Sequence, residues 1–512
     1  MSKEHTRTYN TIANTLFGVV AAAITIILNF VVRVVLVREL GEEINGLHNL
    51  FQSVANMIAL MEAEISTAMV IHLYKPIKEK NKDKIKEVMF FYRNTYVLLA
   101  ITFTFVCAVV DVFFMDKLVT TTIEMSKVRV LFVVFSLSFI TKYLTYHKRS
   151  ILYAEQKNRV SVGVNTVCEL IFRTAEIVSV IVFHEYMIFL ILMICEAATS
   201  NLICSRYVEK YHPYLKSYRG VKASKATKTA IVDTIKPLFV TKIAGTVQQS
   251  ARSILVSILL GNISIVGYFG NYQLVSNAMM NLFSQMGGAV TSSFGNLAVE
   301  NEKARMYVTY RKAAFLMNSI AVVLCAGFIS CIQPFIRFAF GDSFVLPYMS
   351  MILISVELIV YLFAMPIISV QNAMGLHRKD RNQMVAQAII AVTMGYLLGR
   401  FYGMNGILIG LIVPYVIFTY INKGIVVSKF AFEKKATAFL KQVLVDIVKA
   451  GVVITGAVIV ASIISTGSLM LDFLLKGVCS VGISLVLLVI LSWENEYFRL
   501  FYDAIKRKVG RK

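Results

Sequence analysis

The chain has 512 residues, of which 57% are hydrophobic and 16% are charged. A soluble chain of this length would divide into two or more cores with a far more charged surface, so the composition excludes a soluble protein. On a soluble protein the net charge of +22 would suggest a nucleic-acid partner, but here the basic residues lie in short segments between apolar stretches. We therefore expect this charge to orient the chain in a membrane and to contact membrane lipids, with no nucleic acid among the partners.

Fourteen apolar segments follow one another, each long enough to cross a hydrocarbon core of ~30 Å. They predict an all-α polytopic membrane protein with about 14 transmembrane helices. The predicted spans cover roughly 11–37, 44–73, 88–113, 128–147, 160–183, 186–205, 236–260, 264–297, 307–331, 345–372, 384–401, 404–427, 442–465 and 470–492. Because the N-terminus is polar and the first apolar segment is too long for a signal-peptide core, we expect no cleavable signal.

Basic residues separate these spans in an alternating pattern. The loops after even-numbered spans, together with both tails, hold 40 of the 52 lysine and arginine residues, whereas the loops after odd-numbered spans are short and poor in them. Lysine and arginine concentrate in cytoplasmic loops. The alternation therefore predicts an even number of spans and cytoplasmic locations for both termini.

The longest polar stretch, from Arg206 to Lys236, follows the sixth span and divides the chain. We expect a six-helix N-terminal lobe over residues 1–210, a basic cytoplasmic linker over 211–235 and a six-helix C-terminal lobe over 236–430. Two additional helices and a basic interfacial tail follow over 431–512. Equal span counts on the two sides suggest two parallel repeats about an axis normal to the membrane.

Three predicted spans carry polar residues at steps of three and four, which places those residues on one helix face. They are Asn45, Asn49, Gln52, Asn56, Glu62 and Glu64 in 44–73; Lys242, Gly245, Gln249 and Arg252 in 236–260; and Asn271, Gln273, Asn277, Asn281, Ser284 and Gln285 in 264–297. Such stripes cannot face lipid, so they face protein or water. The amides would either bind helices together or line a wet cavity, and their density in 264–297 favours the cavity.

Single charges within the spans have competing interpretations. Arg173 lies four residues after Glu169, so the two can form a structural salt bridge within one helix, while a substrate role stays open. Arg33 and Lys242 lie near span ends, where their side chains can extend to the interface. Arg252 lies far from the basic side and has no acidic neighbour at helical spacing. Its partner must come from another helix, from water or from a bound anion.

Glu62 and Glu64 are candidates for coupling transport to Na⁺ or H⁺. They are equally candidates as counter-ions for Arg252 or Arg33. Beyond such an ion we expect no cofactor.

The remaining sequence shows none of the patterns of catalysis. The seven cysteines form no metal-binding spacing, and no nucleophile–base pair or phosphate-binding loop is present, so we expect neither an enzyme nor a metal site. The small-residue patterns Gly399-x-x-x-Gly403 and Gly406-x-x-x-Gly410 are explained by close packing of helices.

Several segments, in order and at the right spacing between about residues 10 and 440, resemble a known family. They are Glu62-Ala63-Glu64-Ile65-Ser66-Thr67-Ala68, Leu73-Tyr74-Lys75-Pro76, Lys236-Pro237-Leu238-Phe239, Lys242-Ile243-Ala244-Gly245, Val266-Gly267-Tyr268-Phe269-Gly270-Asn271-Tyr272, Ser293-Phe294-Gly295-Asn296-Leu297, Ala373-Met374-Gly375-Leu376 with Asp380-Arg381, and Gly403-Met404-Asn405-Gly406. The chain resembles the polysaccharide or oligosaccharide flippases of the multidrug/oligosaccharidyl-lipid/polysaccharide (MOP) exporter superfamily, in versions closest to those of Gram-positive bacteria.

The resemblance implies two six-helix lobes in a V, with the first, second, seventh and eighth helices lining a central cavity. It also implies alternating access in a bacterial cell membrane, with a lipid-linked oligosaccharide as substrate and a polysaccharide polymerase and glycosyltransferases as candidate partners. Two departures bear on substrate and coupling ion. Glu64 replaces a family glycine, and Arg252-Ser253 stands where relatives often have Asp-Asn.

The hypothesis that follows is translocation of an undecaprenyl-pyrophosphate-linked oligosaccharide from the inner to the outer leaflet. Arg252 and Lys242 are the leading groups for the pyrophosphate, with Arg33 and Arg173 secondary. The amides of 264–297, among them Asn271, Asn277 and Asn281, would bind sugar hydroxyls, and Gln249 and Asn56 are further candidates for the cavity. The alternatives are a multidrug or cation exporter of the same superfamily, a lipid II flippase, a sugar polymerase or ligase, and a scramblase-like or structural assembly partner.

Overall fold

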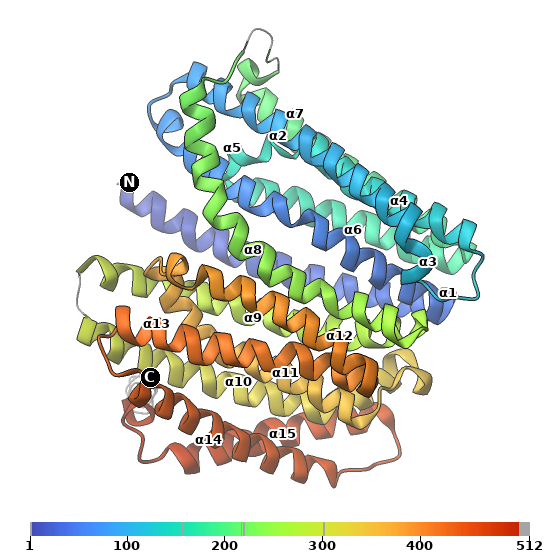
Figure 1. Ribbon diagram of the computed structural model, residues 1–512, viewed down its shortest axis with the longest axis vertical. Helices are drawn as coiled ribbons and strands as arrows, with labels where there is room; N and C mark the ends of the chain where they lie inside the picture. The colour runs from blue at the N-terminus through green and yellow to red at the C-terminus, as the bar shows by residue number, and fades with distance from the viewer. Residues whose placement is uncertain (1–2, 156, 217, 219–220, 301–302, 501–512) are drawn as a thin grey trace. The chain divides into compact units, whose positions relative to one another are not determined.

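The computed structural model describes residues 3–500 except 156, 217, 219–220 and 301–302 (Figure 1). Within helices it describes the backbone but not the side chains of residues 3–19, 58–64, 67–68, 144–145, 158, 234, 236–246, 249, 289, 292–293, 296, 298–300 and 377–378. Nearly all of the described residues are helical, and they include no strand. The predicted all-α class is confirmed.

Fifteen α-helices make up most of the described chain. In chain order they are α1 (Lys3–Lys78), α2 (Lys82–Val109), α3 (Met115–Leu118), α4 (Met125–Tyr146), α5 (Arg149–Ala154), α6 (Asn158–Phe183), α7 (Tyr186–Tyr211), α8 (Lys225–Leu260), α9 (Ile263–Glu300), α10 (Lys303–Phe340), α11 (Tyr348–Ala373), α12 (His377–Val416), α13 (Lys423–Phe430), α14 (Ala436–Ser462) and α15 (Leu469–Ser492). Short π-helical or 3-10 segments are η1 (Val110–Phe114), η2 (Pro213–Leu215), η3 (Asp342–Phe344) and η4 (Ile417–Asn422).

Eight stretches of the described chain are long and apolar enough to cross a membrane. Two of them, Val20–Met57 and Lys379–Phe430, each include parts of two predicted spans. The predicted spans outside these stretches lie on α4, α6, α8 and α9. Each predicted span therefore lies on a helix to within a few residues at its ends, and the chain is a multi-pass membrane protein.

The chain forms two compact units, Met1–Gly267 and Tyr268–Lys512. In the first unit α1 packs against α6 and α8, and α4 packs against α2 and α7. In the second unit α10 packs against α11, α14 and α15. The division into lobes over 1–210 and 236–430 with a linker over 211–235 stays a prediction.

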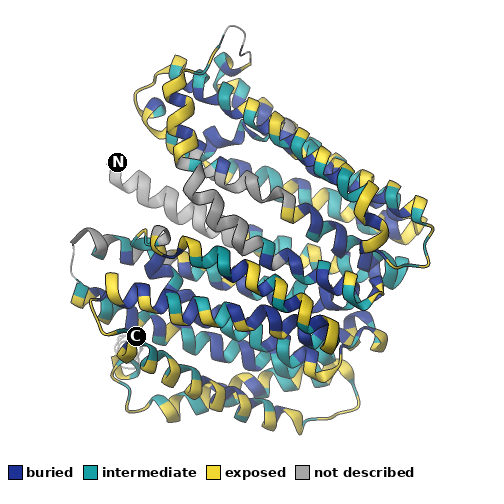
Figure 2. Cartoon of the chain, in the orientation of Figure 1, coloured by how far each residue is buried: buried dark blue, intermediate teal, exposed yellow. Residues whose placement is uncertain are grey.

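Apolar side chains are widely exposed on the described helices (Figure 2). Phe105 on α2 is 67% exposed, and Val478 on α15 is 72% exposed. Water would make so extensive an apolar surface unstable, whereas lipid tails cover it at no cost. These side chains indicate which helix faces meet the bilayer.

Glycines interrupt the two longest helices between the spans that each helix contains. Gly41 in α1 has φ 84°, and Gly403 in α12 has φ 58°. A side chain strongly disfavours this left-handed conformation, so glycine is the residue that permits a turn here. Each long helix is thus two antiparallel helices joined at a glycine, as the residue contacts across Gly41 and Gly403 show.

Close packing within α12 confirms the interpretation of its small-residue pattern. A Cβ atom added at Gly406 would lie 2.1 Å from the carbonyl oxygen of Leu398, and one added at Gly410 would lie 2.4 Å from the amide nitrogen of Gly395. Real Cβ atoms do not come this close to backbone. The two halves of α12 therefore touch through their main chains.

The N-terminal end of α8 and the residue before it form hydrogen bonds with α2. Ser224 caps α8, and its side chain accepts a hydrogen bond from the amide of Thr227. Glu87 on α2 accepts hydrogen bonds at 2.7 Å from the amide of Ser224 and from the hydroxyl of Thr227. Because these groups satisfy donors at the helix terminus, α8 begins at Lys225, well before its apolar part.

Replacing Gly410 with alanine should lower the free energy of unfolding by ~1–3 kcal/mol, because the added methyl group overpacks the backbone of Gly395. Gly451→Ala on α14 is the matched control, since a Cβ atom there meets nothing within 4 Å. Thermal unfolding of the purified variants in detergent measures the difference. Equal melting temperatures for the two variants would contradict the close approach.

Candidate functional site

A stripe of amides on the second half of α1 passes from the protein interior to the surface. Asn45 is 0% exposed and Asn49 is 8% exposed, Gln52 is half-buried, and Asn56 is exposed. Gln52 Nε2 donates a 2.9 Å hydrogen bond to Asn56 Oδ1. The exposed end points toward the basic loop that begins near Lys75. Exposed amides cannot face hydrocarbon, so this end of the stripe meets water.

The amide stripe on α9 changes in the same direction. Asn271 is fully buried, Asn277 is half-buried, and Asn281 and Gln285 are exposed. The exposed end again leads toward a basic segment, which begins at Lys303. Each unit thus carries one amide-lined helix face that opens toward the side of the basic loops. Within these stripes, Gln52 and Asn56 on α1 form an amide–amide hydrogen bond, and the role of the stripes stays a prediction.

Arg33 is engaged inside the first unit and does not extend away from it. Its guanidinium donates a 2.5 Å hydrogen bond to Asn45 Oδ1 and a second hydrogen bond to Asn49 Oδ1. The arginine precedes Gly41 and the two asparagines follow it, so these bonds join the two halves of α1. Asn49 Nδ2 is buried and has no acceptor among the described residues. Because both partners are neutral amides, the positive charge of Arg33 is not cancelled by them.

Arg173 has two carboxylate partners. Its Nη1 lies 2.7 Å from Glu176 Oε2, and its Nη2 lies 3.6 Å from Glu196 Oε2 on α7. Glu176 is completely buried. Glu169, the partner considered from the sequence, accepts a 2.5 Å hydrogen bond from Thr25 on α1. These contacts join α1, α6 and α7, and the carboxylates that form the ion pairs of Arg173 are Glu176 and Glu196 instead of the Glu169 considered from the sequence.

Sequence analysis missed His48 and Glu196 in this region. His48 Nδ1 lies 2.9 Å from the hydroxyl of Tyr186, and the His48 ring makes edge contacts with Phe135 and Phe189. Glu196 pairs with Arg173. A lone carboxylate within the apolar span 186–205 was the available signal for Glu196, since such groups are expensive in a membrane. His48, between Asn45 and Asn49, has no comparable signal.

The second unit contains a buried charged group whose residues are not among the predicted site residues. Asp380 Oδ2 accepts a 2.6 Å hydrogen bond from Gln371 Nε2 and lies 3.6 Å from Lys423 Nζ. All three side chains are buried, and they come from α11, α12 and α13. The negative charge of the carboxylate and the positive charge of the ammonium neutralise each other. The pair therefore has a structural role, because it connects these helices.

For the other predicted site residues, the structure gives few or no side-chain contacts. Arg252 is half-buried on α8 in the first unit. The side chains of Lys242, Gln249, Glu62 and Glu64 lie outside the described residues. Their assignment to substrate or ion stays a prediction. Among the described residues, no group of three or more histidine, cysteine, aspartate or glutamate side chains is arranged to hold a metal ion.

Solved structures of other proteins share this architecture, although their sequences differ widely from this one. No family model matches the chain, and no curated protein sequence matches it. Its structure is similar to the lipid II flippase MurJ in an inward closed conformation, with 14% identity, a TM-score of 0.68 and coverage of 94% of this chain and 99% of that one. It is also similar to an inward-facing multidrug resistance MATE family transporter of the MOP superfamily, with 15% identity, a TM-score of 0.61 and coverage of 82% and 95%.

A MOP superfamily transporter from Pyrococcus furiosus, described as having a binding pocket of reversed polarity, is similar as well. It shares 15% identity and a TM-score of 0.52, and the match covers 81% of this chain and 96% of that one. The chain therefore has the fold of MOP-superfamily transporters. At these identities the likeness extends to the fold alone.

Replacing Arg33 with alanine should lower the free energy of unfolding by ~2–4 kcal/mol, because two buried amide oxygens would each lose a donor. Arg33→Lys should retain only part of this stability, since one ammonium does not reproduce the geometry of a guanidinium. Arg159→Gln, which removes an exposed arginine from α6, is the control. Thermal unfolding in detergent measures all three. An unchanged Arg33→Ala protein would show that the bonds across Gly41 contribute nothing.

Proposed function

We propose that this protein translocates an undecaprenyl-pyrophosphate-linked oligosaccharide from the inner to the outer leaflet of a bacterial cell membrane by alternating access. The observation that carries the proposal is the extent of the structural likeness to a flippase. The MurJ structure covers 94% of this chain, whereas the MATE and Pyrococcus structures cover 82% and 81%. A fold shared over nearly the whole chain favours a lipid-linked substrate over a small drug.

The amide stripes support a sugar substrate. Side-chain amides both donate and accept hydrogen bonds, which is what a sugar hydroxyl requires. The exposed ends of the stripes, at Asn56 on α1 and at Asn281 on α9, lie toward the basic loops. If these loops are cytoplasmic, as the charge pattern predicts, the amides are accessible from the side on which lipid-linked sugars are assembled.

A pyrophosphate needs cationic groups, because an unpaired anion is very costly away from bulk water. Arg252 and Lys242 are the leading candidates. Of the two secondary candidates, Arg33 is the better one. Its described partners are neutral amides, whereas two carboxylates surround Arg173. Coupling of transport to Na⁺ or H⁺ through Glu62 and Glu64 belongs to the same proposal, as do a polymerase and glycosyltransferases as partners.

Lipid II translocation is the second candidate function. The likeness to MurJ favours it directly, since that protein is a lipid II flippase. Both candidates require an anionic lipid-linked sugar to cross the membrane. They differ in the groups attached to the sugar and are separated by comparing the two substrates in one assay.

Arg252→Ala should reduce transport at least about tenfold, because a charge-assisted contact to phosphate contributes more than ~1.4 kcal/mol. Proteoliposomes with a fluorescent undecaprenyl-pyrophosphate oligosaccharide report transport through the fraction of label that reaches the opposite leaflet. Arg252→Lys should retain part of the activity, and Arg159→Gln should retain all of it. Size-exclusion chromatography checks that each variant is folded.

Parallel assays separate the alternatives. Transport of lipid II without transport of the simpler oligosaccharide would select the lipid II function. Efflux of ethidium from the same vesicles without movement of either lipid would replace both with drug export. Wild-type transport by a folded Arg252→Ala protein would remove this arginine from the binding site.

A further inference from the structure

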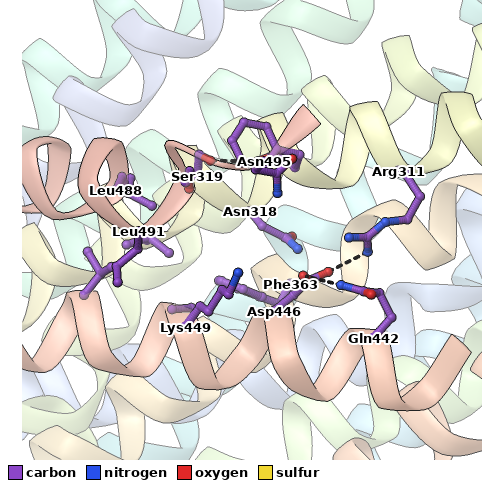
Figure 3. Close-up of a pocket in the computed structure, with 15 residues that line it drawn as sticks. Arg311, Asn318, Ser319, Phe363, Gln442, Asp446, Lys449, Leu488, Leu491 and Asn495 are labelled. Carbon is purple, nitrogen blue, oxygen red and sulfur yellow. Dashed lines mark hydrogen bonds and ion pairs between the residues drawn. The ribbon is translucent and has the colours of Figure 1, made fainter. Parts of the chain in front are cut away.

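A pocket with polar and apolar walls lies in the second unit, between α10, α11, α14 and the end of α15 (Figure 3). Its volume is about 80 Å³, which is room for several water molecules. Neither the predicted cavity nor the amide stripes include its residues. The chemistry of its walls therefore points to a different ligand.

The charges around the pocket do not cancel. Arg311 Nη1 donates a 2.7 Å hydrogen bond to Asp446 Oδ2, and Gln442 Nε2 donates a 3.1 Å hydrogen bond to Asp446 Oδ1. This arginine and this carboxylate form a neutral pair. Lys449, three residues further along α14, also lines the pocket and has no ion-pair partner among the described residues. The pocket thus keeps one positive charge, on a side chain that is exposed.

The pocket also offers an unused hydrogen-bond acceptor. Asn318 Oδ1 on α10 is buried and has no donor among the described residues. In Figure 3 the Asn318 amide lies between Arg311 and Lys449. A ligand that satisfies both groups presents an anionic oxygen to the Lys449 ammonium and a hydroxyl or amine hydrogen to Asn318. Leaving a buried carbonyl oxygen unpaired is costly, so such a ligand gains from both contacts.

The apolar walls and the position of the pocket indicate an amphiphile. Phe363, Val453, Leu488 and Leu491 line the same pocket. Asn495, another lining residue, follows the end of α15, and the neighbouring Trp493 is 56% exposed. Tryptophan at the end of an apolar helix is typical of the membrane–water interface. A ligand bound here would have its polar part at the level of lipid headgroups and its apolar part along α14 and α15.

We infer that this pocket binds the headgroup of an anionic glycerophospholipid, a phosphodiester that also carries a hydroxyl group, as in phosphatidylglycerol. The phosphodiester charge of −1 matches the one unpaired lysine, and the headgroup hydroxyl matches Asn318. Zwitterionic phosphatidylcholine has neither a net charge nor a hydroxyl. The site takes a lipid of the surrounding bilayer, so it does not depend on which substrate the protein transports.

The single tryptophan of the chain provides a direct test. Trp493 and Lys449 line one depression beside the pocket, together with Glu494, which has no ion pair to Lys449 among the described residues. A lipid held by Lys449 therefore approaches the indole. The purified full-length protein is placed in nanodiscs that contain phosphatidylcholine with a small fraction of either brominated phosphatidylglycerol or brominated phosphatidylcholine. Bromine quenches tryptophan fluorescence on contact. The inference predicts stronger quenching by the brominated phosphatidylglycerol.

Matched variants separate a site from general attraction of a basic protein to anionic lipid. Lys449→Gln should abolish the preference for phosphatidylglycerol, while Lys441→Gln, which removes an exposed charge from the same helix outside the pocket, should retain it. Asn318→Leu keeps every charge and should weaken the preference. Folding of each variant is checked by its melting temperature.

Three outcomes would overturn the inference. Equal quenching by the two brominated lipids would show that the pocket does not select an anionic headgroup. Equal loss of preference in Lys449→Gln and Lys441→Gln would assign the effect to overall charge. Loss of the preference on adding soluble glycerol phosphate, at a concentration no higher than that of the lipid, would assign the pocket to free phosphate compounds.

Discussion

Polar side chains that enter apolar helices must find partners in the protein or in water, because hydrocarbon offers none. This constraint organises both units. Arg33 is held by two asparagines, Arg173 by two glutamates, and Asp380 by a lysine and a glutamine. The Arg33 set joins the two halves of α1, the Arg173 set joins α6 to α7, and the Asp380 set joins α11, α12 and α13. The buried charges thus connect helices at sites where pairing is obligatory.

The same constraint distinguishes connecting residues from candidates for transport. Side chains whose hydrogen bonds and charges are matched within the protein have little capacity left for a ligand. The amides of α1 and α9 differ, because each stripe continues from buried to exposed positions and ends where water can reach it. Arg33 stands between the two cases, since its hydrogen bonds go to amides while its charge stays available. In the pocket at Lys449, the lysine likewise keeps a positive charge without an ion-pair partner among the described residues.

Backbone geometry contributes through two glycines. Gly41 and Gly403 allow one continuous helical segment to turn back on itself, and each turn places two apolar helices antiparallel with almost no loop. The close contact of Gly406 and Gly410 with the preceding half of α12 then needs the absence of side chains. On α1, Arg33 performs the corresponding connection through hydrogen bonds. Packing joins one hairpin and polar bonding joins the other.

The amino-acid sequence by itself determined the class of the protein, the position of the helices and the polar stripes within them. Apolar length, the alternation of basic loops and a spacing of three and four are all properties of neighbouring residues, so they need no knowledge of packing. The candidate amides at Asn45, Asn49 and Asn56 were visible in this way.

Tertiary structure alone decided which polar groups are matched and which keep a free charge. Glu196 reaches Arg173 from α7, and Asp446 reaches Arg311 over a separation of 135 residues. Hydropathy cannot reveal such pairs, because the partner depends on which helix faces pack together. For the same reason the sequence does not distinguish Lys449 from other lysines near span ends, because its pocket forms only where α10, α14 and the end of α15 pack together. The sequence indicates where polar residues occur. Packing determines which of their hydrogen-bonding groups and charges remain available for a ligand.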